Sequence, residues 1–201
     1  MRTAGNISEI AADGVDYVGF IFYDKSPRFA GDMPAENTGT IPCGIKKVGV
    51  FVNSSAEEIG RIVDRYGLDM VQLHGDETPG FCEEVKRFIP VMKAFSVSSP
   101  EDFQAIEKYA GTCDFFLFDT KTPGRGGSGE KFDWNLINFY TGDTPFFLSG
   151  GISPNDACAI KKLKHPALRG VDINSRFETE PGIKDALMVN SFIKNIKNTK
   201  I

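Results

Sequence analysis

Polar and charged side chains follow a series of short apolar runs in this sequence, and several are of types that take part in catalysis. Asp119 comes directly after Phe115-Phe-Leu-Phe118, so its carboxyl would lie at the edge of an apolar sheet. Partial burial raises the pKa of a carboxyl and suits it to donate a proton near neutral pH. The alternative is that Asp119 only caps its loop by accepting hydrogen bonds from the backbone.

A second group of residues is of the kind that binds anions. Gly150-Gly151 lies between the run Phe146-Phe-Leu148 and a helix expected to begin near Ser153. Glycines let the backbone approach an anion closely, and a helix N-terminus adds free amides and a positive dipole. The polar segment 172–176 follows the last apolar run. Together these two turns favour a phosphate site over tight turns without a ligand.

Arg28 and His74 follow two further apolar runs. The guanidinium of Arg28 could hold a substrate carboxylate through two parallel hydrogen bonds, although a lone arginine is more often a solvated surface residue. His74 either reaches the site from a strand end or makes a structural hydrogen bond. The segment Gly124-Arg-Gly-Gly-Ser-Gly129 lacks the ending of a P-loop, which leaves a lid or a surface loop.

Strands and helices must position these side chains, and the sequence alternates between the two. Continuous apolar runs are typical of parallel strands covered by helices. Between them, Ser55 with Glu58 three residues later, and Thr78-Pro79, predict helix starts. We expect strands at 17–23, 47–52, 70–73, 91–95, 115–118, 146–148 and 170–173. We expect helices before the first strand and at 55–66, from 78, from 99, 133–139, 153–163 and 185–196.

This alternation predicts an α/β fold with a parallel sheet, formed by residues 1–201 as a single domain. The leading choice is a (β/α)8 TIM barrel, in which the polar strand ends would gather at the carboxyl-terminal face, where barrel enzymes place their active sites. A doubly wound open sheet is the alternative. The glycine fingerprint of its dinucleotide-binding form follows none of the expected strands.

Composition excludes several classes of protein. The 201 residues are 41% hydrophobic with a net charge of -4, which argues against intrinsic disorder and against general nucleic-acid binding. No apolar run approaches the roughly 18–20 residues of a membrane span. The four cysteines form no CxxC pair, so we expect neither a metal site nor a redox motif. Without a recognisable signal peptide at its start, the chain is expected to be cytoplasmic, with reduced thiols.

A set of motifs, in order along nearly the whole chain, resembles those of phosphoribosylanthranilate isomerases, a family of the tryptophan pathway. Each motif is weak alone, but together they are specific. They are residues 19–28, 46–53, 71–77, 118–121, 126–129 with 132–134, 148–152, 170–172 and 181–185.

The resemblance implies an Amadori rearrangement of N-(5'-phosphoribosyl)anthranilate that uses no metal or organic cofactor. It implies that Asp119 protonates the furanose ring oxygen, that Arg28 holds the anthranilate carboxylate and that Asp172 lines the site. The phosphate-binding backbone corresponds to Gly150, Gly151, Asn174 and Ser175. The substrate would be a small molecule, with no nucleic-acid or membrane partner, and the protein a monomer or homodimer.

The chain departs from the family pattern in two places. Arg176 stands where the family has a glycine, so its cation rather than the backbone could contact the phosphate. The family opens with an apolar strand ending in Lys-x-Cys-Gly, whose cysteine is the general base. This chain starts with Met1-Arg-Thr-Ala-Gly-Asn-Ile7, which matches the family residues just after that motif. We therefore expect these residues to lack the first strand and the base, and the natural protein to be longer. None of the four cysteines is assigned as the base.

Two rival functions arise from these departures. One is a related phosphate-binding barrel such as indole-glycerol-phosphate synthase, which needs catalytic lysine and glutamate residues at early strand ends. Lys46 and Lys47 begin a strand rather than end one, which weakens that interpretation. The other is a non-catalytic phosphosugar-binding barrel derived from the isomerase, which the absent cysteine favours.

Overall fold

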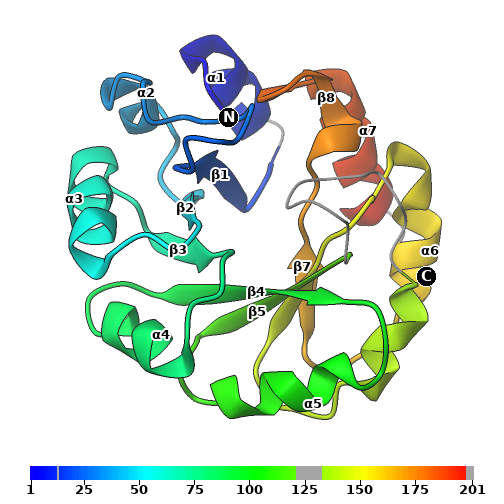
Figure 1. Ribbon diagram of the computed structural model, residues 1–201. Helices are drawn as coiled ribbons and strands as arrows, with labels where there is room; N and C mark the ends of the chain where they lie inside the picture. The colour runs from blue at the N-terminus through cyan, green and yellow to red at the C-terminus, as the bar shows by residue number, and fades with distance from the viewer. Residues whose placement is uncertain (13, 121–132, 198–201) are drawn as a thin grey trace.

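The computed structural model describes residues 1–12, 14–120 and 133–197. Seven parallel strands form one sheet, in which each strand pairs with the next one along the chain (Figure 1). A doubly wound sheet reverses its strand order at a switch point, so the unbroken order shows that this alternative is wrong. The strands are β1 (Tyr17–Ile21), β2 (Lys46–Phe51), β3 (Met70–Leu73), β4 (Val91–Val97), β5 (Phe115–Thr120), β6 (Phe146–Leu148) and β7 (Leu168–Val171).

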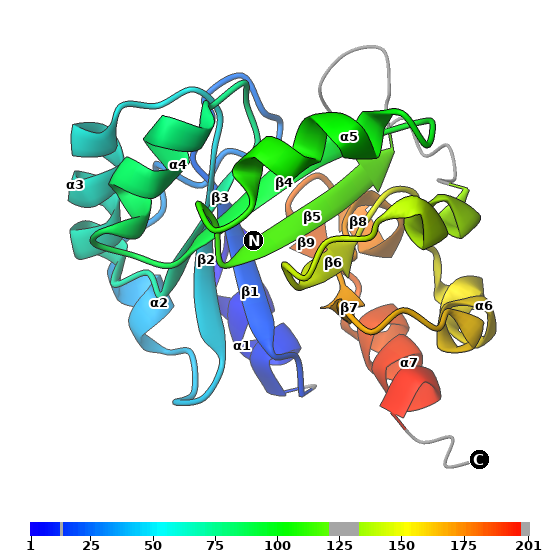
Figure 2. The same ribbon diagram turned by 90° about the horizontal axis from the view of Figure 1, so that it is seen from below.

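The sheet curls into an incomplete barrel with helices around its outer face (Figures 1 and 2). In the described chain, β1 and β7 each pair with a single neighbour, whereas helices α1 and α7 contact each other. The helical layer therefore continues where the strand layer is open, and the expected barrel architecture is confirmed with seven strands. The helices are α1 (Ala4–Ala12), α2 (Glu36–Gly39), α3 (Ala56–Tyr66), α4 (Pro79–Lys86), α5 (Asp102–Ile106), α6 (Ala157–Lys162) and α7 (Ala186–Lys197).

The expected starts of two helices are confirmed by their capping bonds. The hydroxyl of Ser55 accepts a hydrogen bond from the N–H of Glu58, and that of Thr78 accepts one from the N–H of Phe81. Each bond satisfies an N–H group that the first helical turn leaves unpaired. Helix α3 then ends at Gly67, which has the left-handed φ of 56° common at helix ends.

Other boundaries differ from the sequence prediction. Ser99 does not cap a helix, because α5 begins at Asp102, whose carboxylate accepts hydrogen bonds from the N–H groups of Ser98 and Ser99. The segments expected as α-helices at 133–139 and at the start of 153–163 form tighter 3-10 turns. The 3-10 helices are η1 (Glu107–Tyr109), η2 (Trp134–Phe139), η3 (Pro154–Asp156) and η4 (Ser175–Phe177). After η4, β8 (Glu178–Glu180) and β9 (Ile183–Lys184) form a short antiparallel hairpin.

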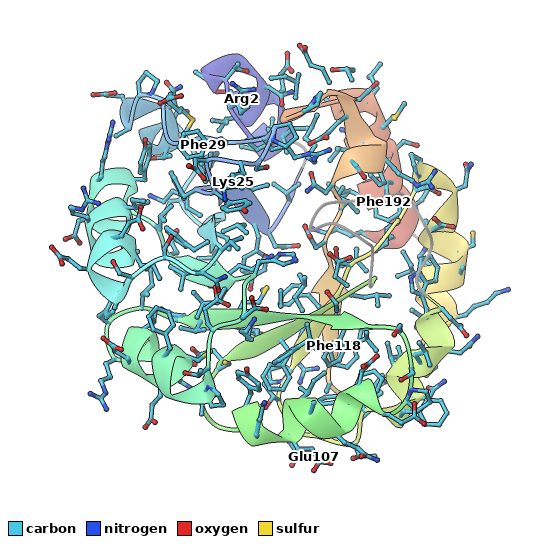
Figure 3. The ribbon with its side chains drawn as sticks, viewed as in Figure 1. Arg2, Lys25, Phe29, Glu107, Phe118 and Phe192 are labelled. Atoms are coloured by element: carbon cyan, nitrogen blue, oxygen red, sulfur yellow. The ribbon has the colours of Figure 1, made fainter. Side chains whose placement is uncertain are left out.

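The apolar side chains form two separate cores. The larger one lies between the sheet and the helices, where Phe118 of β5 packs edge-on against Phe103 of α5 at 5.2 Å between ring centres (Figure 3). The smaller core fills the inside of the curled sheet and forms the floor beneath the strand ends. Its buried members are Val48, Met70, Met92, Ala94, Leu117 and Phe147. None of the described helices is long and apolar enough to cross a membrane.

Candidate active site

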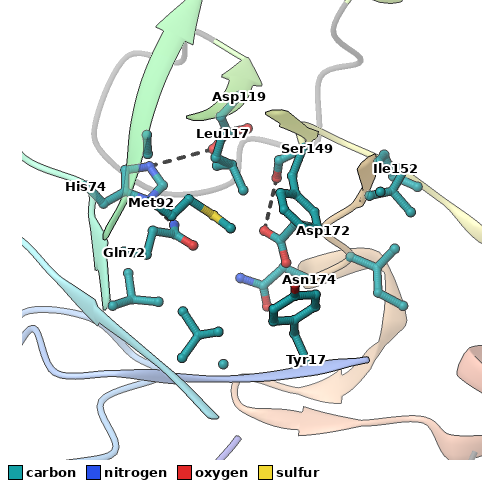
Figure 4. A pocket seen from close by; sticks show the side chains of 18 of the residues that line it. Tyr17, Gln72, His74, Met92, Leu117, Asp119, Ser149, Ile152, Asp172 and Asn174 are labelled. Atoms are coloured by element: carbon teal, nitrogen blue, oxygen red, sulfur yellow. Dashed lines mark hydrogen bonds and ion pairs between the residues drawn. The ribbon is translucent and has the colours of Figure 1, made fainter. Parts of the chain in front are cut away.

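The carboxyl ends of all seven strands of the sheet line one cavity of about 1500 Å³. Residues at these ends continue the hydrogen bonding of the sheet, which fixes their backbones: the N–H groups of His74, Ser149 and Asp172 donate to the carbonyl oxygens of Phe51, Phe118 and Leu148. Several polar side chains therefore face the cavity from a rigid frame (Figure 4). The sequence-predicted residues that line it are Arg28, His74, Asp119, Gly150, Gly151, Asp172, Asn174 and Ser175.

Asp119 lies inside β5 rather than after it, and it pairs in register with Ser96 of β4. Its side chain is 29% exposed, and its Oδ2 lies 3.8 Å from Nε2 of His74 (Figure 4). A carboxyl on a strand at the rim of an apolar barrel is both held in place and open to a ligand. This geometry suits a proton donor better than a loop cap.

A neighbouring amide sets the orientation of the His74 ring. Nε2 of Gln72 lies 2.9 Å from Nδ1 of His74. Because an amide nitrogen only donates, Nδ1 accepts, and the imidazole proton lies on Nε2, the nitrogen that faces Asp119. His74 is thereby both a structural hydrogen-bonding residue and part of the cavity wall, which joins the two interpretations made from the sequence.

A buried ion pair supports the loop after β3. Lys93 is 2% exposed, and its Nζ donates to the carbonyl oxygens of Leu73 and Gly75 and lies 3.2 Å from Oε2 of Glu77. Glu77 in turn accepts hydrogen bonds from the N–H groups of Asn53 and Gly75. Buried charges need such full pairing. This network was not predicted from the sequence. It holds in place the loop after β3 that carries His74.

Asp172 lines the same cavity as Asp119 and follows β7, which is two strands along the sheet from β5. The hydroxyl of Ser149 donates to its Oδ2 at 3.2 Å (Figure 4). Burial raises the pKa of Asp172, and the negative charge of Asp119 adds to the effect, against the opposing charge of Lys184. Asp172 therefore holds a proton more readily than an ordinary aspartate does.

The turn after β6 has the geometry expected of a close backbone approach. Gly150 and Gly151 have φ angles of 88° and 64°, a region that side chains disfavour. The next residues form a capping box, in which Ser153 and Asp156 exchange hydrogen bonds at the start of η3. Asn174 and Ser175 line the same cavity from the β7 side. The two expected phosphate-binding segments are thus brought together.

Arg28 lies on the loop that returns along β1, where the N–H of Ala30 donates to the carbonyl of Ile21. Its guanidinium does not stand alone: Nε lies 2.9 Å from Oε2 of Glu178, and Nη2 lies 2.8 Å from the same oxygen. Glu178 is 150 residues away along the chain, and no local sequence pattern predicts this pairing. Arg28 is therefore a fixed cation at the cavity wall rather than a solvated surface residue.

No cysteine and no cluster of metal-binding side chains lies at the cavity among the described residues. Cys82 and Cys113 are buried elsewhere, Cys43 and Cys158 are exposed, and none of the four lines it. Among the residues described by the structure, no group of three or more His, Cys, Asp or Glu side chains is placed to hold a metal ion. The glycine-rich segment 124–129, expected as a lid or a surface loop, lies outside the described residues.

Comparison with known proteins decides the family. The family model described as N-(5'phosphoribosyl)anthranilate (PRA) isomerase matches residues 1–195. The chain belongs to the phosphoribosylanthranilate isomerase family. A family member from Parabacteroides distasonis is 46% identical over 199 residues, which cover 98% of this chain and 90% of that protein.

Solved structures of phosphoribosylanthranilate isomerases share the fold. One, in complex with reduced 1-(o-carboxyphenylamino)-1-deoxyribulose 5-phosphate, has a TM-score of 0.84 and 30% identity, covering 99% of this chain and 96% of the other. Another contains monomers of the dimeric family member from Thermotoga maritima, with a TM-score of 0.80, 32% identity and the same coverage. The resemblance inferred from the motifs is confirmed.

Proposed function

We propose that the protein is a phosphoribosylanthranilate isomerase, which converts N-(5'-phosphoribosyl)anthranilate into 1-(2-carboxyphenylamino)-1-deoxyribulose 5-phosphate in tryptophan biosynthesis. The observation that carries the proposal is the presence of Asp119, Arg28 and the Gly150-Gly151 turn around one cavity. The substrate has one ring oxygen to protonate and two anionic groups to bind. One carboxyl acid, one fixed guanidinium and one glycine turn match these three requirements.

The rearrangement moves protons and needs no net oxidation. Asp119 would donate a proton to the furanose ring oxygen, and the bond from C1' to that oxygen breaks as the nitrogen lone pair forms an iminium ion. Loss of the C2' proton to a base then gives an enaminol, which becomes the ketone when C1' gains a proton and the C2' hydroxyl loses one. Because none of the described cysteines lines the cavity, we assign no residue of this chain as the base.

The remaining residues would bind and orient the substrate. We assign the phosphate to the backbone of Gly150, Gly151, Asn174 and Ser175 and the anthranilate carboxylate to Arg28. His74 directs its Nε2 proton toward Asp119 and would bind the substrate beside it. Asp172, with its raised pKa, would hydrogen-bond to the sugar hydroxyls.

We also expect the enzyme to act in the cytoplasm, where its four free thiols stay reduced. The protein would bind its small-molecule substrate in the cavity. The protein would be a monomer or a homodimer.

The test is turnover of N-(5'-phosphoribosyl)anthranilate by the wild-type chain and by Asp119→Asn. Where the wild type forms product, we expect D119N to lose about 10²–10⁴-fold in kcat while binding the reduced product analogue within about threefold of wild type. Full activity of D119N would show that Asp119 is not the acid. Tight binding of the analogue by a wild type without turnover would favour the non-catalytic phosphosugar-binding barrel.

A further inference from the structure

Glu178 is a nearly buried carboxylate on which several donors converge. Its side chain is 4% exposed, and its oxygens lie within hydrogen-bonding distance of Nε of Arg28 at 2.9 Å, Nζ of Lys184 at 3.0 Å and the N–H of Gly182 at 3.2 Å. Burial raises the pKa of Glu178, but the bonds and charges of Arg28 and Lys184 outweigh burial and bring its pKa below the usual value. Glu178 is therefore an ionised anchor beside the cavity.

The Glu178 carboxylate contacts one edge of the planar Arg28 guanidinium. Nε and Nη2 both face the Glu178 carboxylate, so the side edge of the planar group is occupied. To the described residues, Nη1 makes no hydrogen bond. A guanidinium has a second edge formed by its two terminal nitrogens, and that edge accepts a planar oxyanion through two parallel bonds. The edge formed by the two terminal nitrogens of Arg28 is thus available for a carboxylate, while the edge bonded to Glu178 fixes the orientation of the guanidinium.

Lys184 sets the net charge of this cluster. Glu178 and Lys184 are opposite each other in the β8–β9 register, which places their side chains together. The lysine backbone is itself fixed, because Asn6 of α1 accepts from its N–H at 2.8 Å and donates to its carbonyl at 2.7 Å. Two cations face one carboxylate, so the cluster of Arg28, Glu178 and Lys184 keeps one positive charge. Without Lys184, Arg28 and Glu178 would neutralise each other.

We propose that Glu178 and Lys184 are positioning residues for the carboxylate-binding arginine. Glu178 orients Arg28 so that its free edge faces the substrate, and Lys184 keeps the cluster attractive to an anion. The inference rests on the proposed function, because it assigns the carboxylate of the aromatic ring to Arg28. It adds that the preference for a carboxylated substrate depends on the hairpin after β7.

The test compares two ligands by isothermal titration calorimetry. One is reduced 1-(o-carboxyphenylamino)-1-deoxyribulose 5-phosphate, and the other is the same molecule without the carboxyl group. We expect the wild type to bind the carboxylated ligand about 10–100-fold more tightly, as for a hydrogen-bonded ion pair. In Glu178→Gln this ratio should fall to about threefold or less, while the affinity for the ligand without the carboxyl group changes little. Glu180→Gln, an exposed position in the same hairpin, should keep the wild-type ratio.

Three results separate the possibilities. If E178Q weakens both ligands equally, Glu178 has only a structural role and the inference is overturned. If the wild type binds neither ligand, the proposed function itself fails. If E178Q does not fold, Lys184→Gln supplies the decision: a reduced carboxylate preference supports the inference, and an unchanged preference overturns it.

Discussion

Asp119 and Asp172 are two carboxyl groups of one cavity with different surroundings. Asp119 is at the end of β5 with the imidazole of His74 beside it, whereas Asp172 accepts a hydrogen bond from Ser149. Burial raises the pKa of Asp172, with the charge of Asp119 as a further contribution. Environments that treat two acids differently are how an active site separates their roles.

The raised pKa of Asp172 predicts that its ionised carboxyl lowers the stability of the folded protein although turnover needs this residue. The folded state holds this proton more tightly than the unfolded chain, so the free energy of unfolding falls as pH rises from the ordinary aspartate pKa of 3.8 through the folded pKa. Asp172→Asn removes that cost and should stabilise the protein at pH 7 by about 0.5–2 kcal/mol while impairing turnover. Urea denaturation at pH 4 and pH 7 measures it.

The gain in D172N should be larger at pH 7 than at pH 4, because the wild-type carboxyl is more fully ionised at pH 7. Ser149→Ala serves as a control that removes the hydroxyl donor to the same carboxyl. A D172N protein that is less stable than wild type at pH 7 would contradict the burial argument.

At the scale of elements, local patterns were readable from the sequence and distant pairs were not. The caps at Ser55 and Thr78 depend on bonds across a few residues, and both were predicted. The helix start predicted at Ser99 was wrong, because a Ser-Pro pair also occurs where the N–H groups donate to a later aspartate, here Asp102. The pairing of Arg28 with Glu178 joins residues 150 apart, and only the assembled barrel brings them together.

The turn after β6 allows a prediction at this scale. Both of its glycines have positive φ, so Gly150→Ala should cost about 1–3 kcal/mol in the free energy of unfolding. It should also weaken binding of the reduced product analogue, because a side chain keeps the phosphate from the backbone. Thermal denaturation and calorimetry measure the two effects.

Gly60→Ala in α3 is the matched control. Gly60 is inside the helix, and an added Cβ there meets nothing within 4 Å. Helix propensity predicts a gain of about 0.5–1 kcal/mol in stability and no change in binding. Equal effects of G150A and G60A would contradict the assigned backbone geometry at position 150.

At the scale of the whole molecule, the sheet order explains why the site exists. The strands follow one another around the curled sheet, so their carboxyl ends lie on one rim. The residues that line the cavity at this rim are as far apart in the chain as Arg28 and Lys184. The strand–helix alternation predicted this rim, and the family motifs named the residues on it. The sequence did not reveal the buried supports behind the rim, such as Lys93 with Glu77, because their partners come from different strands and loops.

The most direct test is a crystal structure of the chain with the reduced product analogue. We predict its phosphate at the N–H groups of Gly150 and Gly151, its carboxylate within about 3 Å of Arg28, and Asp119 at the hydroxyl derived from the ring oxygen. Such a structure would establish the rim as the isomerase site. A phosphate at Arg28, or a ligand that leaves Asp119 without a contact, would contradict the account.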